Sequence, residues 1–230
     1  MDFVDNLRRY AKVRTTSIAF PSSIFDNTPT PHLEAYLVGQ IARAAVVFNV
    51  SEIIIFEEEN NPVSESRTNR LVKLFEYAEC PQYLRKQIFR IEPDLKCAGI
   101  INSKEANHHL RSSQLDCPYR EGVTTKHVQL DGNEKPDFTE VNIGLNQPII
   151  VPGFEELHTR VTVKVDPNDL KRIQSMLGPT SRELCKGVVV APVEPLEKLN
   201  LYWGYYVRRV TSISKVMDES VFVPGRKDFY

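Results

Sequence analysis

The sequence predicts an α/β protein: a parallel sheet packed against helices in the first half of the chain, followed by a β-rich module of barrel type. Two observations carry this prediction. Residues 15–56 have the pattern strand, helix, strand, and parallel strands require such a crossover, which is nearly always right-handed. After about residue 110 the helical periodicity fades, and short β-like runs separated by Gly, Pro and Asn follow, as in small barrels.

Three segments define the first βαβ unit. Residues 15–20 (TTSIAF) are β-branched and apolar, which predicts a strand that ends at the following proline. Thr30 and Pro31 are typical of a helix N-cap and first helical residue, and this helix should end near Asn49. Its apolar stripe is predicted to be Leu33, Leu37, Ile41, Ala44, Ala45 and Phe48. Residues 52–56 (EIIIF) predict a strand that is covered on both faces.

The segment after this unit predicts two more helices and another strand. Residues 68–79 have helical periodicity, with Leu71, Leu74, Phe75 and Ala78 as the apolar stripe. Pro81 breaks that helix and is expected to begin the next one, residues 81–89. Residues 97–101 (CAGII) predict a third buried strand of the sheet.

The second half of the chain predicts a small barrel. Its candidate strands are residues 121–128, 139–145, 148–151, 159–165, 186–193 and 202–216. Residues 167–178 (PNDLKRIQSMLG) predict one helix between these strands. Such a barrel with a single helix matches the OB pattern, although the periodicity is equally compatible with an SH3-like barrel.

Composition narrows the classes of partner. The 230 residues carry a formal net charge of −1, so any nucleic-acid site must be a local basic patch, not a field over the whole molecule. No apolar run reaches the roughly 18–20 residues of a membrane span, and residues 1–14 lack the apolar region of a secretory signal. We therefore expect no membrane partner.

The cysteines do not indicate a metal centre. Cys80, Cys97, Cys117 and Cys185 form no CxxC pair. Reduced, partly buried thiols in a reducing compartment are the expected state. Motifs for a nucleophilic serine, a Walker loop or a dinucleotide-binding glycine loop are also missing, so the catalytic residues stay unknown.

Basic residues on the predicted helices are candidates for RNA phosphate contacts. Arg43 lies on the first helix, where a solvent-exposed arginine is the alternative reading. Arg85, Lys86 and Arg90 lie within about one turn of each other and form a basic ridge that suits phosphate positioning. Arg70 and Lys73 are upstream of this ridge on the preceding helix. The alternative for the ridge is an ordinary solvated helix face.

Two further candidates lie near the predicted junction of the two modules. His108 and His109 are adjacent in the sequence NHHLR and point to different sides, so we do not expect them to bind one metal ion together. We expect His108 and Arg111 either to pack at the junction or to contact RNA. Arg120, in the motif YREGV, belongs to the same set of RNA candidates.

The densest aromatic cluster precedes two arginines near the end of the chain. Tyr202 and Tyr206 would share one face of a strand, with Trp203 and Tyr205 on the other. Aromatic rings interleaved with arginines such as Arg208 suit single-stranded nucleic acid, because bases stack on the rings and phosphates pair with the cations. We expect one face to be barrel core and the other to bind RNA.

Several motifs together carry a family resemblance. They occur in order along the chain from Thr15 to Tyr230: YLVGQIARAAVVFNVSEIIIFEE, EYAECPQYLRK, CAGIINSKEANHHLR, YREGV and LYWGYYVR. With these motifs the chain resembles the eukaryotic and archaeal RNA methyltransferases of the SPOUT superfamily that carry an OB-like insertion. The resemblance implies a Rossmann-like (SPOUT) parallel sheet that ends in a trefoil knot, with the inserted barrel of OB type.

The resemblance also implies partners and a location. Members of that family use S-adenosylmethionine, which binds in the knot at a dimer interface. The family is associated with structured, ribosomal or pre-ribosomal RNA. A homodimer or a heterodimer with a paralogue is expected. The location is nuclear or nucleolar if the protein is eukaryotic, and otherwise cytoplasmic.

The family's cofactor loops follow the position that matches Tyr230. We therefore expect no cofactor-binding residue in this chain, and expect the chain to be a fragment of a longer protein. The predicted division is residues 1–110 plus 217–230 for the SPOUT-like part and residues 111–216 for the OB-like insertion. An active methyltransferase, an inactive ribosome-assembly factor with the same fold and a protein-binding module remain the three hypotheses.

Overall fold

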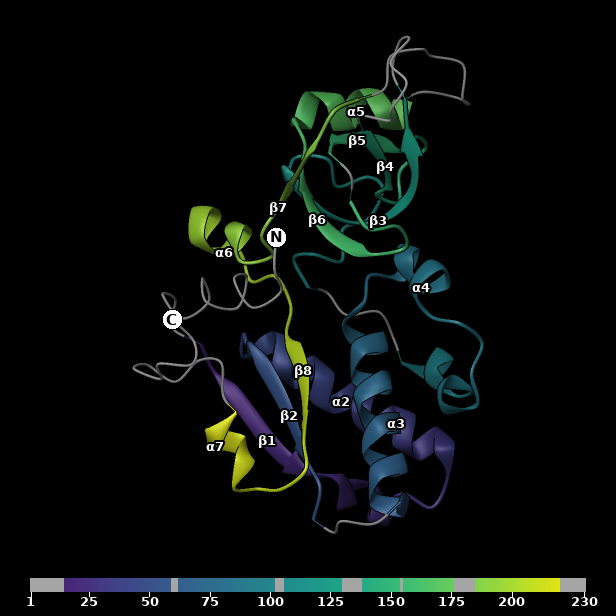
Figure 1. Cartoon of the computed structure of the whole chain (residues 1–230), viewed down its shortest axis with the longest axis vertical. Coiled ribbons are helices and arrows are strands. Elements are labelled where there is room, and N and C mark those ends of the chain that lie inside the picture. Colours follow the sequence, from purple (N-terminus) through teal and green to yellow (C-terminus); the bar gives the residue numbers. More distant parts are fainter. Residues whose placement is uncertain are drawn as a thin grey trace. The chain divides into compact units, whose positions relative to one another are not determined.

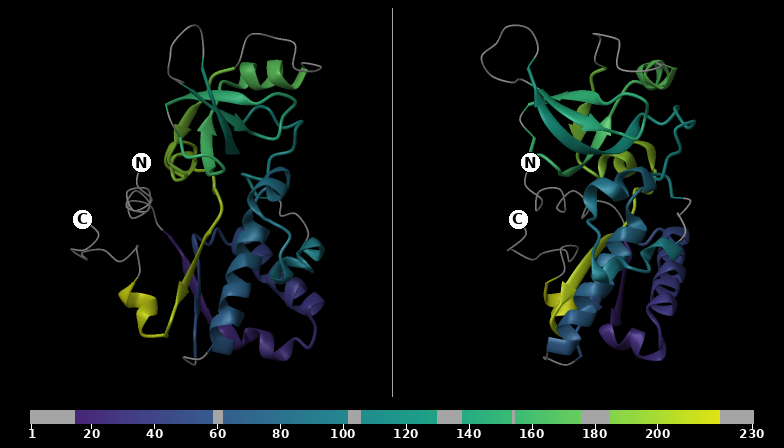
Figure 2. Two further views of the ribbon diagram at one scale, coloured as in Figure 1. Left: turned by 45° about the vertical axis from the view of Figure 1, so that its right-hand side comes forward. Right: turned by 90° about the vertical axis from the view of Figure 1, so that its right-hand side faces the viewer.

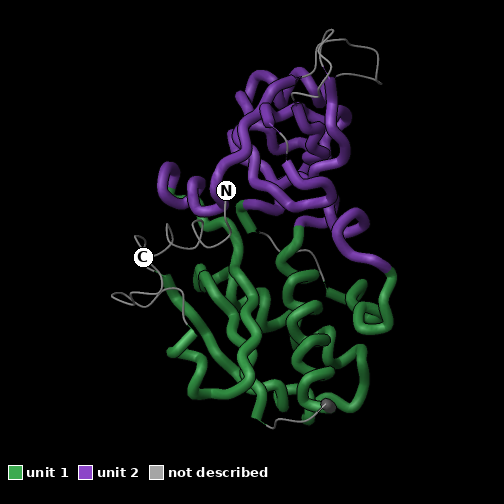
Figure 3. The backbone as a smooth tube through the Cα atoms, viewed as in Figure 1, with its two compact units in different colours: residues 1–80, 91–107, 200–230 green, residues 81–90, 108–199 purple. Residues whose placement is uncertain are grey.

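The computed structural model describes residues 15–58, 62–101, 106–129, 138–153, 155–175 and 185–219. The expectations for residues 1–14 and for most of residues 217–230 lie outside this part. The chain divides into two compact units (Figure 3). Unit 1 is drawn in green and contains Met1–Cys80, Ile91–Asn107 and Asn200–Tyr230; unit 2 is drawn in purple and contains Pro81–Arg90 and His108–Leu199.

Unit 1 contains the predicted parallel sheet. Its strands β1 (Ser17–Pro21), β2 (Glu52–Phe56) and β8 (Tyr206–Val210) lie in the order β1-β2-β8, and both pairs are parallel. The prediction that residues 202–216 form a barrel strand is wrong, because β8 pairs with β2 across more than 150 residues of chain. Period-2 patterning in that segment indicates a strand, but it does not identify the sheet that the strand joins.

The helices α2 (Pro31–Val47) and α3 (Pro62–Glu79) lie against one face of this sheet (Figures 1 and 2). The predicted start of α2 is confirmed, since the Thr30 hydroxyl accepts a hydrogen bond from the Leu33 amide. The predicted stripe of α3 is confirmed as well: Leu71, Leu74, Phe75 and Ala78 are all buried.

The predicted stripe of α2 is only partly right. The helix buries its small side chains, which lie at Ala35, Val38, Gly39, Ala42 and Ala45, whereas Leu33, Ala44 and Phe48 are exposed. Small residues allow the helix backbone to lie close to the sheet and α3. Leu37 and Ile41 of the predicted stripe are half-buried against the same core, whereas Tyr36 and Val47 lie on the outer face.

Residues 97–101 do not form a strand, which corrects the sequence prediction. This segment contains the short helix η3 (Ala98–Ile100), and both Gly99 and Ile100 are exposed. Unit 1 also contains η1 (Ser22–Asn27), η2 (Pro93–Leu95) and α7 (Lys215–Asp218). A run of five apolar residues is too short to separate a strand from a helical turn by periodicity.

Unit 2 is a curled antiparallel sheet with the order β5-β4-β3-β6-β7. Its strands are β3 (Tyr119–Val128), β4 (Phe138–Asn142), β5 (Ile149–Pro152), β6 (Arg160–Lys164) and β7 (Val188–Val190). A parallel bridge between Ile150 and Lys186 brings the two ends of the sheet together. The predicted helix is confirmed as α5 (Pro167–Ser175), and α6 (Glu194–Leu199) follows β7.

Each unit has its own hydrophobic core. In unit 1, Ile53, Ile55 and Val207 of the sheet pack against α2 and α3. In unit 2, Val141, Ile149, Val151 and Val163 line the inside of the curled sheet, together with Leu170 and Ile173 of α5. None of the helices in the described part of the chain has the length and apolar character of a membrane span.

Candidate functional site

The helix α4 (Gln82–Ile88) is fixed to the curled sheet of unit 2. The Tyr83 hydroxyl donates a hydrogen bond of 2.9 Å to the backbone carbonyl of Glu121 on β3. The ring of Tyr83 also lies directly against Gly144, where a Cβ atom would come within 2.3 Å of it. Gly144 has a φ of +73°, a conformation that glycine adopts without strain. Tyr83 and Gly144 therefore form a clamp between α4 and the sheet.

This clamp presents the basic ridge that the sequence predicts. Lys86 and Arg90 are exposed, and neither forms an ion pair with another described residue. Arg85 is different, because it is only 8% exposed and lies in the buried part of the helix. Two of the three predicted basic residues are thus free to contact an anionic ligand such as RNA phosphate.

Arg120 is a buried anchor within unit 2. It is fully buried, and its guanidinium donates to the backbone carbonyls of Arg111 (2.8 Å), Gln114 (2.7 Å) and Ile143 (3.4 Å). Burial lowers the pKa of this guanidinium, because it penalises the charged form. The side chain holds the turn from Arg111 to Gln114 and is not accessible to RNA in this structure. The side chain of Arg111 itself is exposed beside that turn.

The predicted histidine candidate is also buried. His108 has no exposed surface, and its ring lies edge-on to that of His109, with 4.3 Å between the ring centroids. In this position its ring packs against His109 and offers no surface to RNA. Among the described residues no group of three His, Cys, Asp or Glu side chains is placed to hold a metal ion, and all four cysteines are free thiols.

The outer surface of the curled sheet is largely neutralised by ion pairs. The Lys126 ammonium lies 3.2 Å from Glu140, the Arg160 guanidinium 2.6 Å from Glu121, and the Lys164 ammonium 3.7 Å from Glu194. Paired cations attract phosphate less than unpaired ones do. Among the described residues of unit 2, Lys86, Arg90 and Arg111 are exposed cations without such a partner, in contrast to these strand residues.

The aromatic cluster that precedes β8 lies in unit 1. Tyr202 and Trp203 are buried, and the Tyr202 hydroxyl donates to the Val50 carbonyl at 2.8 Å. Tyr206 is half-buried. Gly204, with a φ of +96°, interrupts the segment, so the predicted alternation of faces does not extend across it. Whether any of these rings contacts RNA stays a prediction, and Tyr202 and Trp203 offer little ring surface for stacking.

Arg208 is held in a buried ion pair on the sheet. Its guanidinium donates to the Glu52 carboxylate at 2.7 Å and to the Val216 carbonyl at 2.9 Å. Glu52 also accepts a hydrogen bond from the Ser17 hydroxyl at 2.7 Å. The pair thus connects all three strands of the parallel sheet, which is a structural role for Arg208.

The carboxyl edge of the parallel sheet holds a second arginine network. Arg209 donates to Glu57 at 2.7 Å, to Asn69 at 2.8 Å and to Glu65 at 3.2 Å. Burial opposes the charged guanidinium, but the hydrogen bonds to Glu57 and Glu65 raise its pKa overall. Ligands of open α/β sheets bind at this edge; here the network occupies it.

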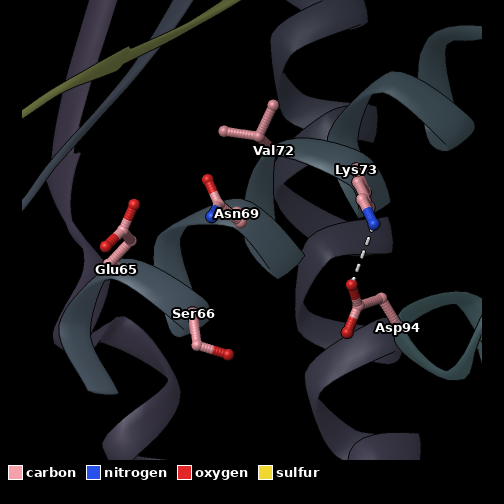
Figure 4. Close-up of a pocket in the computed structure, with 6 residues that line it drawn as sticks. All are labelled: Glu65, Ser66, Asn69, Val72, Lys73 and Asp94. Carbon is pink, nitrogen blue, oxygen red and sulfur yellow. Dashed lines mark hydrogen bonds and ion pairs between the residues drawn. The ribbon is translucent and has the colours of Figure 1, made fainter. Parts of the chain in front are cut away.

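A cavity of about 520 Å³ lies beside α3 (Figure 4). It is lined by Glu65, Ser66, Asn69, Val72, Lys73 and Asp94. Lys73 forms ion pairs with both Asp94 and Glu92, and Arg70 pairs with Glu34. The two basic residues that the sequence places upstream of the ridge are therefore neutralised, and they belong to unit 1.

The cavity beside α3 does not fit S-adenosylmethionine. Its adenine requires an apolar or aromatic slot, and Val72 is the one apolar side chain that lines the cavity beside α3. The Arg209 network fills the edge of the sheet. We assign no contact with a methyl donor to these residues.

Arg43 lies on the exposed face of α2. Around it the same face presents several apolar side chains to solvent, namely Leu33, Tyr36, Val47 and Phe48. Single exposed apolar residues need no explanation, whereas several on one helix face indicate a contact surface. The sequence analysis missed this surface because it assigned Leu33 and Phe48 to the core.

The sequence analysis also missed the clamp between α4 and the sheet. Nothing in the spacing of Tyr83 and Gly144 links them, since they are far apart in the chain. The one available signal was Gly144 itself, a glycine within the predicted strand of residues 139–145, because a glycine in such a position often marks a close approach of another element.

Comparison with known proteins gives consistent matches. A family model described as "Putative RNA methyltransferase" matches residues 15–229. A 28S rRNA (uridine-N(3))-methyltransferase of Drosophila melanogaster is 35% identical over 233 residues, which cover 92% of this chain and 44% of that protein. The enzymes of the same name from Mus musculus and Homo sapiens are each 34% identical, covering 92% of this chain and 54% and 56% of those proteins. The chain thus spans about half the length of these relatives.

Proposed function

Since the chain belongs to this RNA methyltransferase family, we propose that it is the RNA-engaging part of a methyltransferase that acts on structured ribosomal RNA. The observation that carries the proposal is the match along nearly the whole chain to relatives named as 28S rRNA methyltransferases. The uridine N3 atom in their names is the first acceptor to test. A nuclear or nucleolar location follows if the protein is eukaryotic.

The proposed RNA surface is α4 together with the turn at Arg111. Lys86, Arg90 and Arg111 are exposed cations on unit 2, and the clamp of Tyr83 on Gly144 holds α4 in place. Rigid placement favours binding because fewer side chains and backbone segments must be ordered when RNA arrives. These contacts are to phosphate, so they position the RNA without reading its sequence.

We assign the two units to the SPOUT and OB types. For unit 2, the pairing order and the parallel bridge between Ile150 and Lys186 support an OB-type barrel, although α5 lies between its fourth and fifth strands. For unit 1, the parallel sheet with helices between its strands supports a SPOUT-type fold. The proposed methyl donor is S-adenosylmethionine, held by residues other than those described.

We further propose that two copies of the chain pair through the outer face of α2. The exposed residues on this face are symmetric about Gln40: in an antiparallel pair, Leu33 would meet Val47 and Tyr36 would meet Ala44. A two-fold contact requires such a self-complementary patch. A paralogue with the same pattern would pair in the same way.

Charge reversal on α4 tests the RNA surface. The variant Lys86→Glu/Arg90→Glu should bind a ribosomal RNA stem-loop about tenfold more weakly, and its plot of log affinity against log salt should be shallower by about 2, because two phosphate contacts are lost. Fluorescence anisotropy at several salt concentrations measures both quantities. Lys198→Glu is the matched control, since Lys198 is an exposed lysine of the same unit on α6.

Two results would contradict the proposal at different points. Unchanged RNA affinity of the α4 variant would remove α4 from the RNA surface. Calorimetry with S-adenosylmethionine on the longest form of the protein, combined with transfer of labelled methyl groups to ribosomal RNA, tests the enzyme. A folded protein that binds the RNA but neither binds nor uses the donor would be an assembly factor on a methyltransferase fold.

A further inference from the structure

Lys186 differs from the other exposed cations on the outer surface of the curled sheet. It lies two residues before β7, is exposed and has no carboxylate partner among the described residues. Its ammonium lies 5.6 Å from the centroid of the Phe138 ring, which is within the range of a cation–π contact. By contrast, Lys126 on the same sheet is paired with Glu140.

Phe138 and Lys186 lie on the outside of the sheet. Residues of a strand alternate between its faces, and Val141 and Val151 point into the core of unit 2. Phe138 is therefore on the outer face of β4, where it is half-buried and pairs with Pro152 of β5. Lys186 forms a parallel bridge with Ile150 of β5, which is the strand next to β4. From this position its ammonium reaches the Phe138 ring.

An aromatic ring with an unpaired cation beside it has the chemistry that binds an unstacked nucleotide. A base packs on the exposed part of the ring, and the phosphate of the same nucleotide pairs with the ammonium. A base within a continuous duplex is not available for this contact, because its faces are covered by neighbouring base pairs. The pair would thus distinguish single-stranded from double-stranded RNA.

We propose that Phe138 and Lys186 form a binding site for one unstacked nucleotide in a single-stranded segment of the RNA. The proposal rests on the proposed RNA-binding function and adds to it a substrate class: RNA with an unpaired segment beside the structured part that α4 contacts. Phe138 is the stacking platform and Lys186 the phosphate contact.

Substitutions at the two positions test the site on the full chain. Phe138→Leu keeps an apolar side chain and removes the ring, and it should weaken binding of a single-stranded RNA of about 12 nucleotides by about tenfold. Phe138→Tyr should retain the affinity. Lys186→Ala should lower the salt dependence by about 0.7 in the log–log slope, as expected for one contact to a single strand, and Lys186→Arg should restore it. None of these changes should alter binding of an RNA duplex of the same length.

The controls separate this inference from the function on which it rests. Lys126→Ala removes a paired lysine from the same surface and should have little effect. If the Lys86→Glu/Arg90→Glu variant binds RNA weakly while Phe138→Leu and Lys186→Ala bind as wild type does, the nucleotide site is wrong and the proposed function stands. If wild type itself binds no RNA, both proposals are wrong. An equal loss of duplex and single-strand affinity in Phe138→Leu would also overturn the site.

Discussion

At the scale of single residues, two arginines that the sequence offers for RNA contact are buried inside the protein and bind other protein groups. Arg120 and Arg208 are both candidates for RNA contact on the sequence, and both are buried. Arg208 has Glu52 as its counter-ion, whereas Arg120 is held by three backbone carbonyls. A buried cation requires such partners, since it loses the hydration that it has in water.

Replacing Arg120 separates its structural role from a role in binding. Arg120→Met keeps most of the side-chain volume but leaves the carbonyls of Arg111 and Gln114 without their donor. We expect the free energy of unfolding to fall by about 3 kcal/mol, measured by urea denaturation. Arg111→Ala, on an exposed side chain, should change stability by less than about 0.5 kcal/mol. A stable Arg120→Met protein with weakened RNA binding would mean that Arg120 contacts RNA directly.

At the scale of elements, α4 is held on unit 2 by Tyr83, through its hydrogen bond to Glu121 and the close approach of its ring to Gly144. The ring of Tyr83 occupies the space that a side chain at position 144 would need. As a result α4 belongs to unit 2, although α3, which precedes it by only a few residues, belongs to unit 1. The basic residues of α3 therefore belong to unit 1, and those of α4 belong to unit 2.

A methyl group at position 144 should break the clamp. Gly144→Ala adds a Cβ within 2.3 Å of the Tyr83 ring at a φ of +73°, so we expect a loss of stability of about 2–4 kcal/mol and faster amide exchange in α4. Hydrogen-exchange mass spectrometry measures the latter. Gly153→Ala is the matched control: its φ is +99° but its Cβ would meet nothing within 4 Å, so it should cost only about 1 kcal/mol. Equal effects of both changes on α4 would argue against the clamp.

At the scale of the whole molecule, unit 1 is discontinuous in sequence. Its sheet is completed by β8, which follows the curled sheet of unit 2 in the chain and pairs with β2. Unit 2 has a separate core and lies within this interruption. The small net charge of −1 permits pairing of copies through an apolar helix face, because long-range repulsion between them is weak.

The α2 surface gives a prediction about oligomeric state. Val47→Glu places a charge on each side of the proposed two-fold contact, so it should convert a dimer to a monomer in sedimentation velocity at micromolar concentration. Met217→Glu is the matched control, because Met217 is also an exposed apolar residue of unit 1, on α7. A wild-type chain that is monomeric at this concentration, or a Val47→Glu variant that remains dimeric, would rule out pairing through α2.

The sequence by itself determined the elements whose signals are local. The strand at residues 52–56, the cap at Thr30 and the buried stripe of α3 follow from neighbouring residues alone, because period and capping are properties of a short segment. The family motifs and the cationic character of Lys86, Arg90 and Arg111 could be recognised in the same way.

Only the tertiary structure decided which sheet receives β8, which face of α2 is buried and which candidate cations are accessible. Each of these depends on residues far apart in the chain: Arg208 contacts Glu52, Lys73 contacts Asp94, and α2 packs against α3 and the sheet. A side chain's own pattern shows that it is cationic or apolar, but whether it faces a carboxylate, a carbonyl or water is set by the partner that folding brings to it.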